Sequence, residues 1–321
     1  MKELLQLSVN GSTQHALVRG RAGAPVLLLA QAGPGFPMIS EADALEAALR
    51  LEGNFRVVYW DQRGAGRSVE DSEAPLTVDD LAADLVEVAR ALCARLRVDT
   101  VDVAGFSLGG TLALLAAARP DAPIGRLVLV GPDVDFARSE EYAWRFALQE
   151  ARRRGHGKAL AQLERIGPPP HSSPERFMTR VRWVTDFGGV QVGMSFLRLF
   201  LTVLLRMVRS PYYSLRQVLE ALRGMQRTQR RTLAALQRLS LLDRLASLAP
   251  LPVPITVVQG RLDAAAPPEL AAQLVEQLDA PRGKRLVWMD DCAHSPHFEA
   301  PAAFRSVLLE ALAPAVEAPV G

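Results

Sequence analysis

Short runs of apolar residues recur in both outer thirds of the chain, and they have the length and composition of buried β-strands. Each run is five or six residues long, rich in Val, Leu or Ile, and mostly bounded by Gly, Pro or Asp. Because polar and apolar positions do not strictly alternate, the runs favour a parallel sheet that is covered on both faces. The predicted strands are residues 25–30, 55–60, 100–104, 126–130, 254–258 and 285–289.

Segments with helical spacing of apolar residues lie between and after these runs. Strand and helix therefore alternate, which predicts an α/β fold with a doubly wound, mostly parallel sheet. Residues 3–9 and 14–18 carry a weaker strand pattern and are expected to form an amphipathic hairpin before the first strong strand. The predicted helices are residues 41–50, 78–96, 108–118, 268–278 and 301–312.

The alternation stops after Gly131, and only helix-like patterns follow until the last third of the chain. We therefore expect an α/β core formed by residues 1–132 and 250–321, with residues 133–249 inserted as a helical cap. Charge supports this division, because residues 144–246 contain 19 Lys and Arg against six Asp and Glu, while the whole chain carries only +2. The basic segment predicts a lid with a surface of its own.

Residues 195–209 form the most apolar predicted helix, with arginines at positions 198, 206 and 209. A helix that is apolar almost all round is usually buried, so we expect a cap helix packed on its neighbours. An alternative is that its inner side lines an acyl pocket, with Phe200 and Leu204 sharing one face. At about 1.5 Å per residue this helix spans about 22 Å, which is too short to cross a bilayer.

Composition excludes several classes of protein. Hydrophobic residues make up 49% and charged residues 22% of the chain, which excludes a disordered or fibrous protein. The small net charge argues against a nucleic-acid partner. Cys93 and Cys292 are far apart and no metal-ligand spacing occurs, so neither a disulfide framework nor a metal site is expected. Residues 1–10 lack a signal-peptide core and no apolar run reaches about 18 residues, so we expect a cytoplasmic protein without a transmembrane span.

The sequence VDVAGFSLGG, residues 101–110, places Gly-x-Ser-x-Gly between a predicted strand and a predicted helix. In this context the pattern marks a nucleophile, because a strained turn exposes the hydroxyl of the central serine, here Ser107. Side chains at Gly105 or Gly109 would collide with the neighbouring strand and helix. The N–H of Leu108 lies at the helix N-terminus, where it favours a developing oxyanion. The alternative interpretation is an inert serine in a glycine-rich turn.

Residues 31–35 (QAGPG), residues 61–68 (DQRGAGRS) and the GFSLGG of the nucleophile turn together resemble the proline iminopeptidase-like branch of the α/β-hydrolase-fold serine hydrolases. Gln31-Ala32-Gly33-Pro34-Gly35 takes the place of an HGGPG-type loop, DQRGAGRS resembles a DQRGxGxS signature, and GFSLGG stands where that branch commonly has GGSWG. The resemblance implies a Ser-Asp-His triad and a second oxyanion donor at Gly33. A main-chain donor survives the replacement of histidine and glycine by Gln31 and Ala32, provided that the loop keeps its course.

The base is a histidine that follows the nucleophile and the acid along the chain. Residues 293–301, AHSPHFEAP, resemble the GHSPxxExP pattern of the family, which implies His294 as the base and leaves His297 as its rival. His156 lies in a basic stretch and His171 follows three prolines. Neither of these two follows a core strand.

The acid is implied by the resemblance of Gly-Arg-Leu-Asp, ending at Asp263, to the GRxD loop of the family. Asp263 would otherwise be a turn-stabilising aspartate. Asp290 and Asp291 are expected to be loop or capping residues, while Asp61 and Arg63 are expected to fix a loop beside the active site.

These features predict a cofactor-independent serine hydrolase that cleaves a carboxylic ester or thioester through an acyl-enzyme. The expected partner is a small-molecule substrate with an apolar acyl part and, as an option, an anionic group attracted by the basic cap. A proline iminopeptidase-like aminopeptidase is the alternative, but it needs carboxylates in the cap to bind a protonated amine, and acids are sparse there. A non-catalytic ligand-binding member of the fold is less favoured. The sequence leaves the oligomeric state open.

Overall fold

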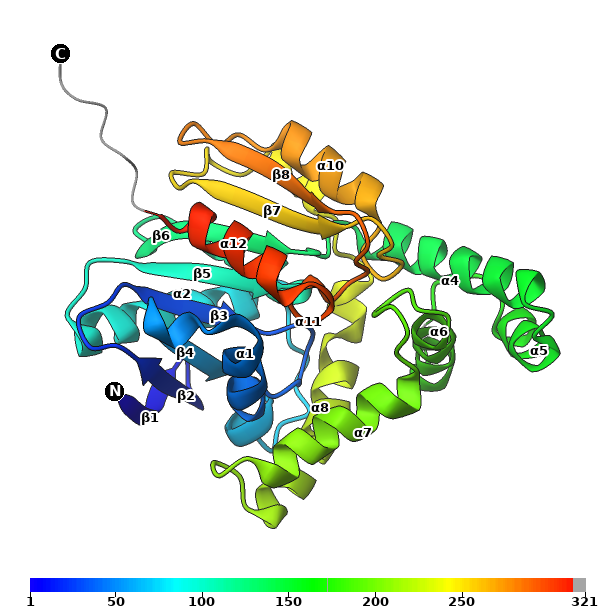
Figure 1. Ribbon diagram of the computed structural model, residues 1–321, viewed down its shortest axis with the longest axis horizontal. Coiled ribbons are helices and arrows are strands. Elements are labelled where there is room, and N and C mark those ends of the chain that lie inside the picture. Colours follow the sequence, from blue (N-terminus) through cyan, green and yellow to red (C-terminus); the bar gives the residue numbers. More distant parts are fainter. Residues whose placement is uncertain (172, 314–321) are drawn as a thin grey trace.

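A central sheet of eight strands organises the computed structural model, which describes residues 1–171 and 173–313 (Figure 1). The strands are β1 (Lys2–Val9), β2 (Ser12–Gly20), β3 (Val26–Ala30), β4 (Arg56–Asp61), β5 (Val101–Phe106), β6 (Ile124–Val130), β7 (Ile255–Gly260) and β8 (Lys284–Met289). Their order in the sheet is β1-β2-β4-β3-β5-β6-β7-β8. The pairs β1–β2 and β2–β4 are antiparallel, and every later pair of neighbours is parallel.

Helices cover both faces of the sheet (Figure 1). The core helices are α1 (Ala42–Leu49), α2 (Val78–Leu96), α3 (Leu108–Ala117), α10 (Pro268–Gln277), α11 (Pro296–Glu299) and α12 (Pro301–Ala311). Helices α2, α3 and α10 share one apolar cluster with the sheet, and α1 and α12 share the other. Consecutive residues of β3 alternate between the clusters, since Val26 and Leu28 belong to the first and Leu27 and Leu29 to the second. Burial of both strand faces explains the continuous apolar runs in the sequence.

The predicted fold class is confirmed, including the amphipathic hairpin, which is β1 and β2. Each predicted core strand and helix is present, with ends displaced by at most two residues. The largest displacements extend β5 and β7 toward their carboxyl ends and β6 toward its start. These extensions carry β5 and β7 to the loops that hold the predicted nucleophile and acid.

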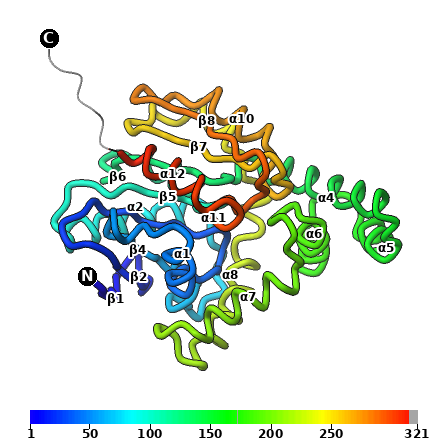
Figure 2. Tube along the Cα trace, in the orientation of Figure 1, coloured from blue at the N-terminus to red at the C-terminus, as the bar shows by residue number. Residues whose placement is uncertain are grey.

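Only helices separate β6 from β7 along the described chain, and the tube in Figure 2 shows them beside and below the sheet. They are α4 (Phe136–Arg153), α5 (Gly157–Ile166), α6 (Pro174–Asp186), α7 (Phe196–Arg209), α8 (Leu215–Leu236) and α9 (Leu241–Leu245). Helices α4, α5 and α6 enclose an apolar cluster of their own around Trp183. We call residues 133–249 the cap, the division that the sequence predicts.

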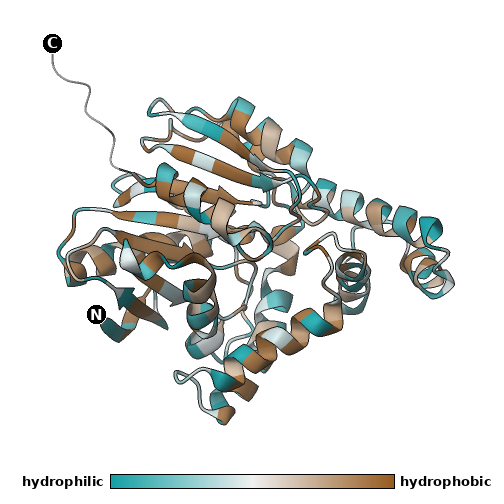
Figure 3. Cartoon of the chain, viewed as in Figure 1, coloured by the Kyte–Doolittle hydropathy of each residue, from teal (hydrophilic) through white to brown (hydrophobic). Residues whose placement is uncertain are grey.

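The expectation that residues 195–209 form a buried helix is wrong. The helix α7 is present, but Met207 is its only buried residue. Val203 and Leu204 pack against the core cluster, whereas Phe200 is 41% exposed. Figure 3 shows hydrophobic residues along the length of α7 at the edge of the molecule. The cap is one helix deep at this point, so α7 packs against the core on one side, and no described residue covers its other side.

One buried carboxylate, Asp84 of α2, fixes the first hairpin and the loop after β4 to the core. It accepts hydrogen bonds from Asn10 Nδ2 at 2.9 Å and Gln14 Nε2 at 2.7 Å. The guanidinium of Arg63 binds both carboxylate oxygens, at 2.7 and 2.8 Å. The charge of Asp84 is therefore compensated by a bidentate partner, the geometry that makes a buried ion pair tolerable. Arg63 fixes its loop, as the sequence predicts.

We expect Asp84→Ala to lower the free energy of unfolding by about 3 kcal/mol, because it strips partners from Arg63 and from two amides. Glu87→Ala is the matched control on the same helix. Glu87 pairs with Arg90 at the exposed surface, so its loss should cost less than about 1 kcal/mol. Denaturant unfolding measures both values, and equal losses would contradict this role of Asp84.

Candidate active site

The backbone places Ser107 on a strained turn between β5 and α3. Its φ and ψ are +50° and −123°, an unusual combination for a residue with a side chain. The turn is held by a hydrogen bond of 2.8 Å from Ser107 N to Val130 O on the neighbouring strand β6. A Cβ on Gly105 would overlap the carbonyl of Gly109, and a Cβ on Gly109 would overlap the carbonyl of Ala30. The two glycines of the pattern thus allow strand, turn and helix to pack closely, as expected.

The structure brings together His294 and Asp263, which lie 31 residues apart in sequence. His294 Nδ1 is 2.7 Å from Asp263 Oδ2. The two residues lie on loops that follow the adjacent parallel strands β7 and β8, so their carboxyl ends meet at one edge of the sheet. Gly131, at the end of β6, has a φ of +50°, and a Cβ there would lie 3.0 Å from His294 Nδ1 and 3.1 Å from Asp263 Oδ2. A glycine therefore leaves room for the pair.

Asp263 is held in place by a full set of donors. Its Oδ1 accepts the N–H groups of Ala265 and Ala266, each at 2.8 Å, and its Oδ2 accepts Gln259 Nε2 at 3.1 Å in addition to the imidazole. The carboxylate is only 1% exposed. These contacts fix the orientation in which Asp263 meets His294.

The rival His297 has a different environment. Its ring packs between Phe106 and Phe298, with centroid separations of 4.7 and 4.5 Å. Burial, with the charges of His294 and Arg206 nearby, lowers the pKa of His297 to about 3. A neutral ring in an aromatic cluster is a packing element.

Two further histidines, His156 and His171, lie in the cap, and neither contacts this pair. His156 caps the start of α5 and accepts the N–H of Ala159 at 3.2 Å. His171 is fully buried, and its Nε2 lies 3.0 Å from the carbonyl of Gly167. Both have structural contacts that explain their presence.

The loop predicted to carry an oxyanion donor begins against the nucleophile turn. The carbonyls of Ala30 and Gln31 approach Gly109 so closely that a Cβ would not fit between them. Gly33 has a φ of +99°, a conformation that suits glycine. Leu108 is the first residue of α3, so no carbonyl within that helix accepts its N–H. Both predicted donors therefore belong to segments that meet beside Ser107.

Asp61 fixes the far end of this loop. It is fully buried at the end of β4, and one carboxylate oxygen accepts the N–H groups of Met38 and Ile39 at 2.7 and 2.9 Å. The other accepts the N–H of Arg67 at 2.8 Å and the hydroxyl of Tyr213, which belongs to the cap. Asp61 thus positions the loop and anchors the cap, as expected for a residue that does not act chemically.

Asp133 is a residue of the site that the sequence prediction missed. Ser107 Oγ donates a long hydrogen bond of 3.4 Å to Asp133 Oδ2, and no described hydrogen bond joins Ser107 to His294. Asp133 follows the end of β6 by three residues, so its place after a predicted strand was the available signal. Burial raises the pKa of its carboxyl to about 6, while the positive charge of His294 opposes this effect.

Electrostatics around His294 favour the protonated imidazole. Burial lowers its pKa, but the carboxylates of Asp263 and Asp133 outweigh burial and raise the pKa to about 9. An imidazolium held by two carboxylates is the species that forms when a histidine takes the proton of a serine. These surroundings therefore stabilise a positive charge on the His294 ring.

Glu299 of α11 ties the His294 loop to the cap. Its carboxylate accepts the N–H groups of Ala293 at 3.1 Å, Ser295 at 3.0 Å and Val192 at 2.8 Å. The backbone of His294 donates in turn to the carbonyl of Val190 at 3.0 Å. The segment before α7 and the histidine loop therefore form one connected unit.

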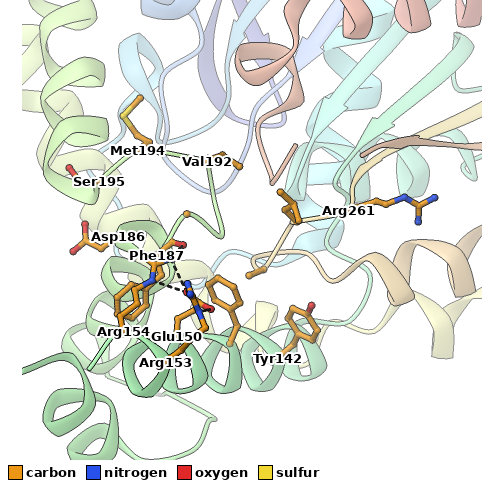
Figure 4. A pocket seen from close by; sticks show the side chains of 15 residues that line it. Tyr142, Glu150, Arg153, Arg154, Asp186, Phe187, Val192, Met194, Ser195 and Arg261 are labelled. Carbon is orange, nitrogen blue, oxygen red and sulfur yellow. Dashed lines mark hydrogen bonds and ion pairs between the residues drawn. The ribbon is translucent and has the colours of Figure 1, made fainter. Parts of the chain in front are cut away.

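A pocket of about 770 Å³ lies between α4 and the loop that carries Asp263 (Figure 4). Phe146, Phe187 and Val192 give it apolar walls, and neither Ser107 nor His294 lines it. Figure 4 shows Arg153 and Arg154, at the end of α4, beside Glu150, which binds Arg153 at 2.7 Å. The pocket borders the loop of Asp263 through Leu262 and Ala264, its neighbours in sequence, and Ser107 does not line it.

Across residues 1–171 and 173–313, no group of three or more His, Cys, Asp and Glu is arranged to hold a metal ion. No helix within the same residues has the length and apolar character needed to span a bilayer.

Comparison with known proteins gives the family. The sequence profile of the Alpha/beta hydrolase family matches residues 26–307, so the chain belongs to this family. It is 28% identical to the probable aminopeptidase YbaC of Bacillus subtilis (strain 168), with 94% of each chain covered. A proline iminopeptidase of Xanthomonas citri is 41% identical over 90 residues, 28% of this chain and 27% of that one. The crystal structure of a proline iminopeptidase-related protein from Thermus thermophilus has a TM-score of 0.58 and 23% identity, with 97% of both chains covered.

Membership of this family makes the protein an enzyme, a hydrolase acting on small molecules. The resemblance to the proline iminopeptidase-like branch is confirmed as well, because relatives with that name are found both in sequence and in structure. The roles of Ser107, Asp263, His294, Gly33 and Leu108 stay predictions.

We expect Asp133→Asn to lower the pKa of His294, since loss of a nearby negative charge destabilises the imidazolium. Asp135→Asn is the matched control, because it removes the same charge two residues away, and asparagine can still cap α4. Titration of the His294 ring by NMR measures the shift. An unchanged pKa in Asp133→Asn, or equal shifts in both variants, would contradict the coupling.

Proposed function

We propose that the protein is a serine hydrolase that uses Ser107 as nucleophile, His294 as base and Asp263 as orienting acid. The observation that carries this proposal is the short contact between His294 Nδ1 and a buried, fully hydrogen-bonded Asp263, beside a serine on a strained turn. A bound carboxylate fixes the tautomer in which Nε2 faces the nucleophile. An inert serine would not require a histidine–aspartate pair of this geometry beside it.

The reaction follows from these groups. Ser107 Oγ attacks the carbonyl carbon of the substrate while His294, in its neutral form, takes the proton, and the N–H groups of Leu108 and Gly33 stabilise the oxyanion. His294 then returns the proton to the leaving group, which departs and leaves an acyl-enzyme. Water activated by the same imidazole releases the acid and restores Ser107. Because Ser107 rests on Asp133, its hydroxyl must turn to His294 when substrate binds.

A fluorophosphonate probe should label the native protein at Ser107 and fail to label Ser107→Ala. Replacement of the base, His294→Ala, should reduce kcat by about four orders of magnitude or more. His297→Phe is the control, since an aromatic ring preserves its packing, and it should keep most of the activity. Mass spectrometry locates the label, and labelling of Ser107→Ala at the native level would refute the proposal.

We propose a carboxylic ester or thioester as the bond that is cut. Several cap carboxylates are already neutralised by arginines, as Glu150 is by Arg153 and Glu220 is by Arg216. Carboxylates in such pairs are poor receptors for a substrate ammonium group, which supports an uncharged acyl part.

Hydrolysis of an amide next to a free amine is the second candidate, and Asp133 is the observation that favours it. A carboxylate within 3.4 Å of the nucleophile would also lie close to an ammonium group on the carbon beside the attacked carbonyl. The relative that matches this chain along 94% of its length is named a probable aminopeptidase. In this candidate a core residue, Asp133, recognises the substrate amine, whereas the sequence analysis expected cap carboxylates to do so.

Three substrates with related acyl groups separate the candidates. The p-nitrophenyl ester and p-nitroanilide of cyclopentanecarboxylic acid differ in the bond, and proline p-nitroanilide adds only the ring amine. For each substrate, kcat is divided by the rate of its uncatalysed hydrolysis. We expect this ratio to be highest for the p-nitrophenyl ester. A preference for proline p-nitroanilide that disappears in Asp133→Asn and persists in Asp135→Asn would overturn the ester proposal in favour of the aminopeptidase.

A further inference from the structure

The outer face of α7 carries a row of exposed apolar side chains. Leu197, Leu201, Leu205 and Val208 are 64%, 51%, 46% and 44% exposed. With about 3.6 residues per turn they fall within a sector of about 80° and extend over about 16 Å. We call these four residues the α7 stripe. A shallow groove of about 290 Å³ runs along it.

The α7 stripe has no partner in the described part of the fold, because α7 uses its other side for packing. Val203 and Leu204 contact the core cluster, and Met207 is buried. Arg206 on the packed side pairs with Glu41 and lies 4.6 Å from the ring of Phe298. Four large exposed apolar residues on one helix face exceed the scattered apolar residues of an ordinary surface, and such faces mark interaction sites.

Basic charge borders the stripe. Arg198 and Arg209 are exposed and lie on one side of it, about 20–40° further round the helix. Neither guanidinium pairs with a carboxylate anywhere in the described part of the chain. The helix sequence FLRLFLTVLLRMVR contains no acidic residue. Apolar residues on one face beside unpaired arginines are the composition of helices that lie in the interface of an anionic membrane.

We propose that α7 docks the enzyme on an anionic lipid bilayer, with the α7 stripe inserted among the acyl chains and Arg198 and Arg209 bound to lipid phosphates. Charge decides against a second copy as the occupant, because a symmetric contact would bring the unpaired arginines of two α7 helices together. The helix is interfacial rather than spanning, in keeping with its length. This surface is independent of the catalytic roles proposed above.

The docked geometry places the active-site rim near the membrane. The packed side of α7 contacts Glu41, which follows the oxyanion loop, and Phe298, four residues after His294. The membrane would therefore lie about one helix diameter, about 10 Å, from these loops. Substrates carried in or on the bilayer would reach the site over a short path.

Flotation of the full-length protein with vesicles of phosphatidylglycerol and phosphatidylcholine, compared with phosphatidylcholine alone, tests the proposal. The wild type should bind the anionic vesicles and lose affinity at high salt. Leu201→Gln with Leu205→Gln should weaken binding at least about tenfold, since two buried apolar side chains are lost. Gln keeps a good helix propensity, and Leu4→Gln, on the exposed side of β1, is the matched control that should bind normally.

A second double variant, Arg198→Gln with Arg209→Gln, tests the contribution of charge and should weaken vesicle binding several-fold. Its control is Arg50→Gln with Arg97→Gln, which removes the same charge from another part of the surface. Turnover of a soluble short-chain ester and the melting temperature verify that every variant is folded. If a double variant misfolds, Leu197→Gln alone should still reduce binding. Absence of vesicle binding by the wild type, or equal binding by stripe and control variants, would overturn the proposal. The proposal would also be overturned if the wild type sedimented as a dimer, did not bind vesicles, and became monomeric only in the stripe variants.

Discussion

The contact between His294 and Asp263 depends on how parallel strands end. The carboxyl ends of neighbouring parallel strands lie at one edge of the sheet, and here the loops after β7 and β8 carry Asp263 and His294. Ser107, the proposed nucleophile, follows β5. Strand β6 lies between β5 and β7, and Gly131 at its end lies against both His294 and Asp263. Registry of the sheet therefore determines the site, because a displacement of one residue would separate groups that must meet within hydrogen-bond distance.

The cap is connected to the same edge through polar contacts at several points. Tyr213 reaches Asp61, Val192 reaches Glu299, and Arg231 pairs with Glu70 at 2.6 Å. Arg227, another arginine of α8, pairs with Glu73 at 3.0 Å. Part of the basic charge of the cap therefore serves to bind acidic loops of the core, which explains why a basic insertion and an acidic core occur in one chain. The excess that remains unpaired in the described chain, including Arg198 and Arg209, faces outward.

Sequence patterns predicted the fold well because strand burial and helix periodicity are local signals. The Gly-x-Ser-x-Gly turn was also local, and its steric reason holds in the structure, where Gly105 and Gly109 permit contacts that no side chain would. The pairing of Asp263 with His294 needed the family resemblance, since nothing near either residue specifies a partner 31 positions away.

Two features lay beyond sequence reasoning. Asp133 reaches Ser107 only through the path of the loop after β6, and no pattern distinguishes it from other acids that follow strands. The exposure of α7 depends on the cap being one layer deep, whereas an apolar helix in a sequence resembles a buried one. Both depend on which parts of the chain surround a residue in three dimensions.

The central claim is that Ser107, His294 and Asp263 act as one unit, and non-additivity of their replacements tests it most directly. Turnover of the same ester by Asp263→Asn, His294→Ala and the combined variant gives the three losses in kcat. If the acid works only through the histidine, the combined variant should be no slower than His294→Ala alone. Losses that multiply, so that Asp263→Asn still reduces kcat when His294 is absent, would contradict the account.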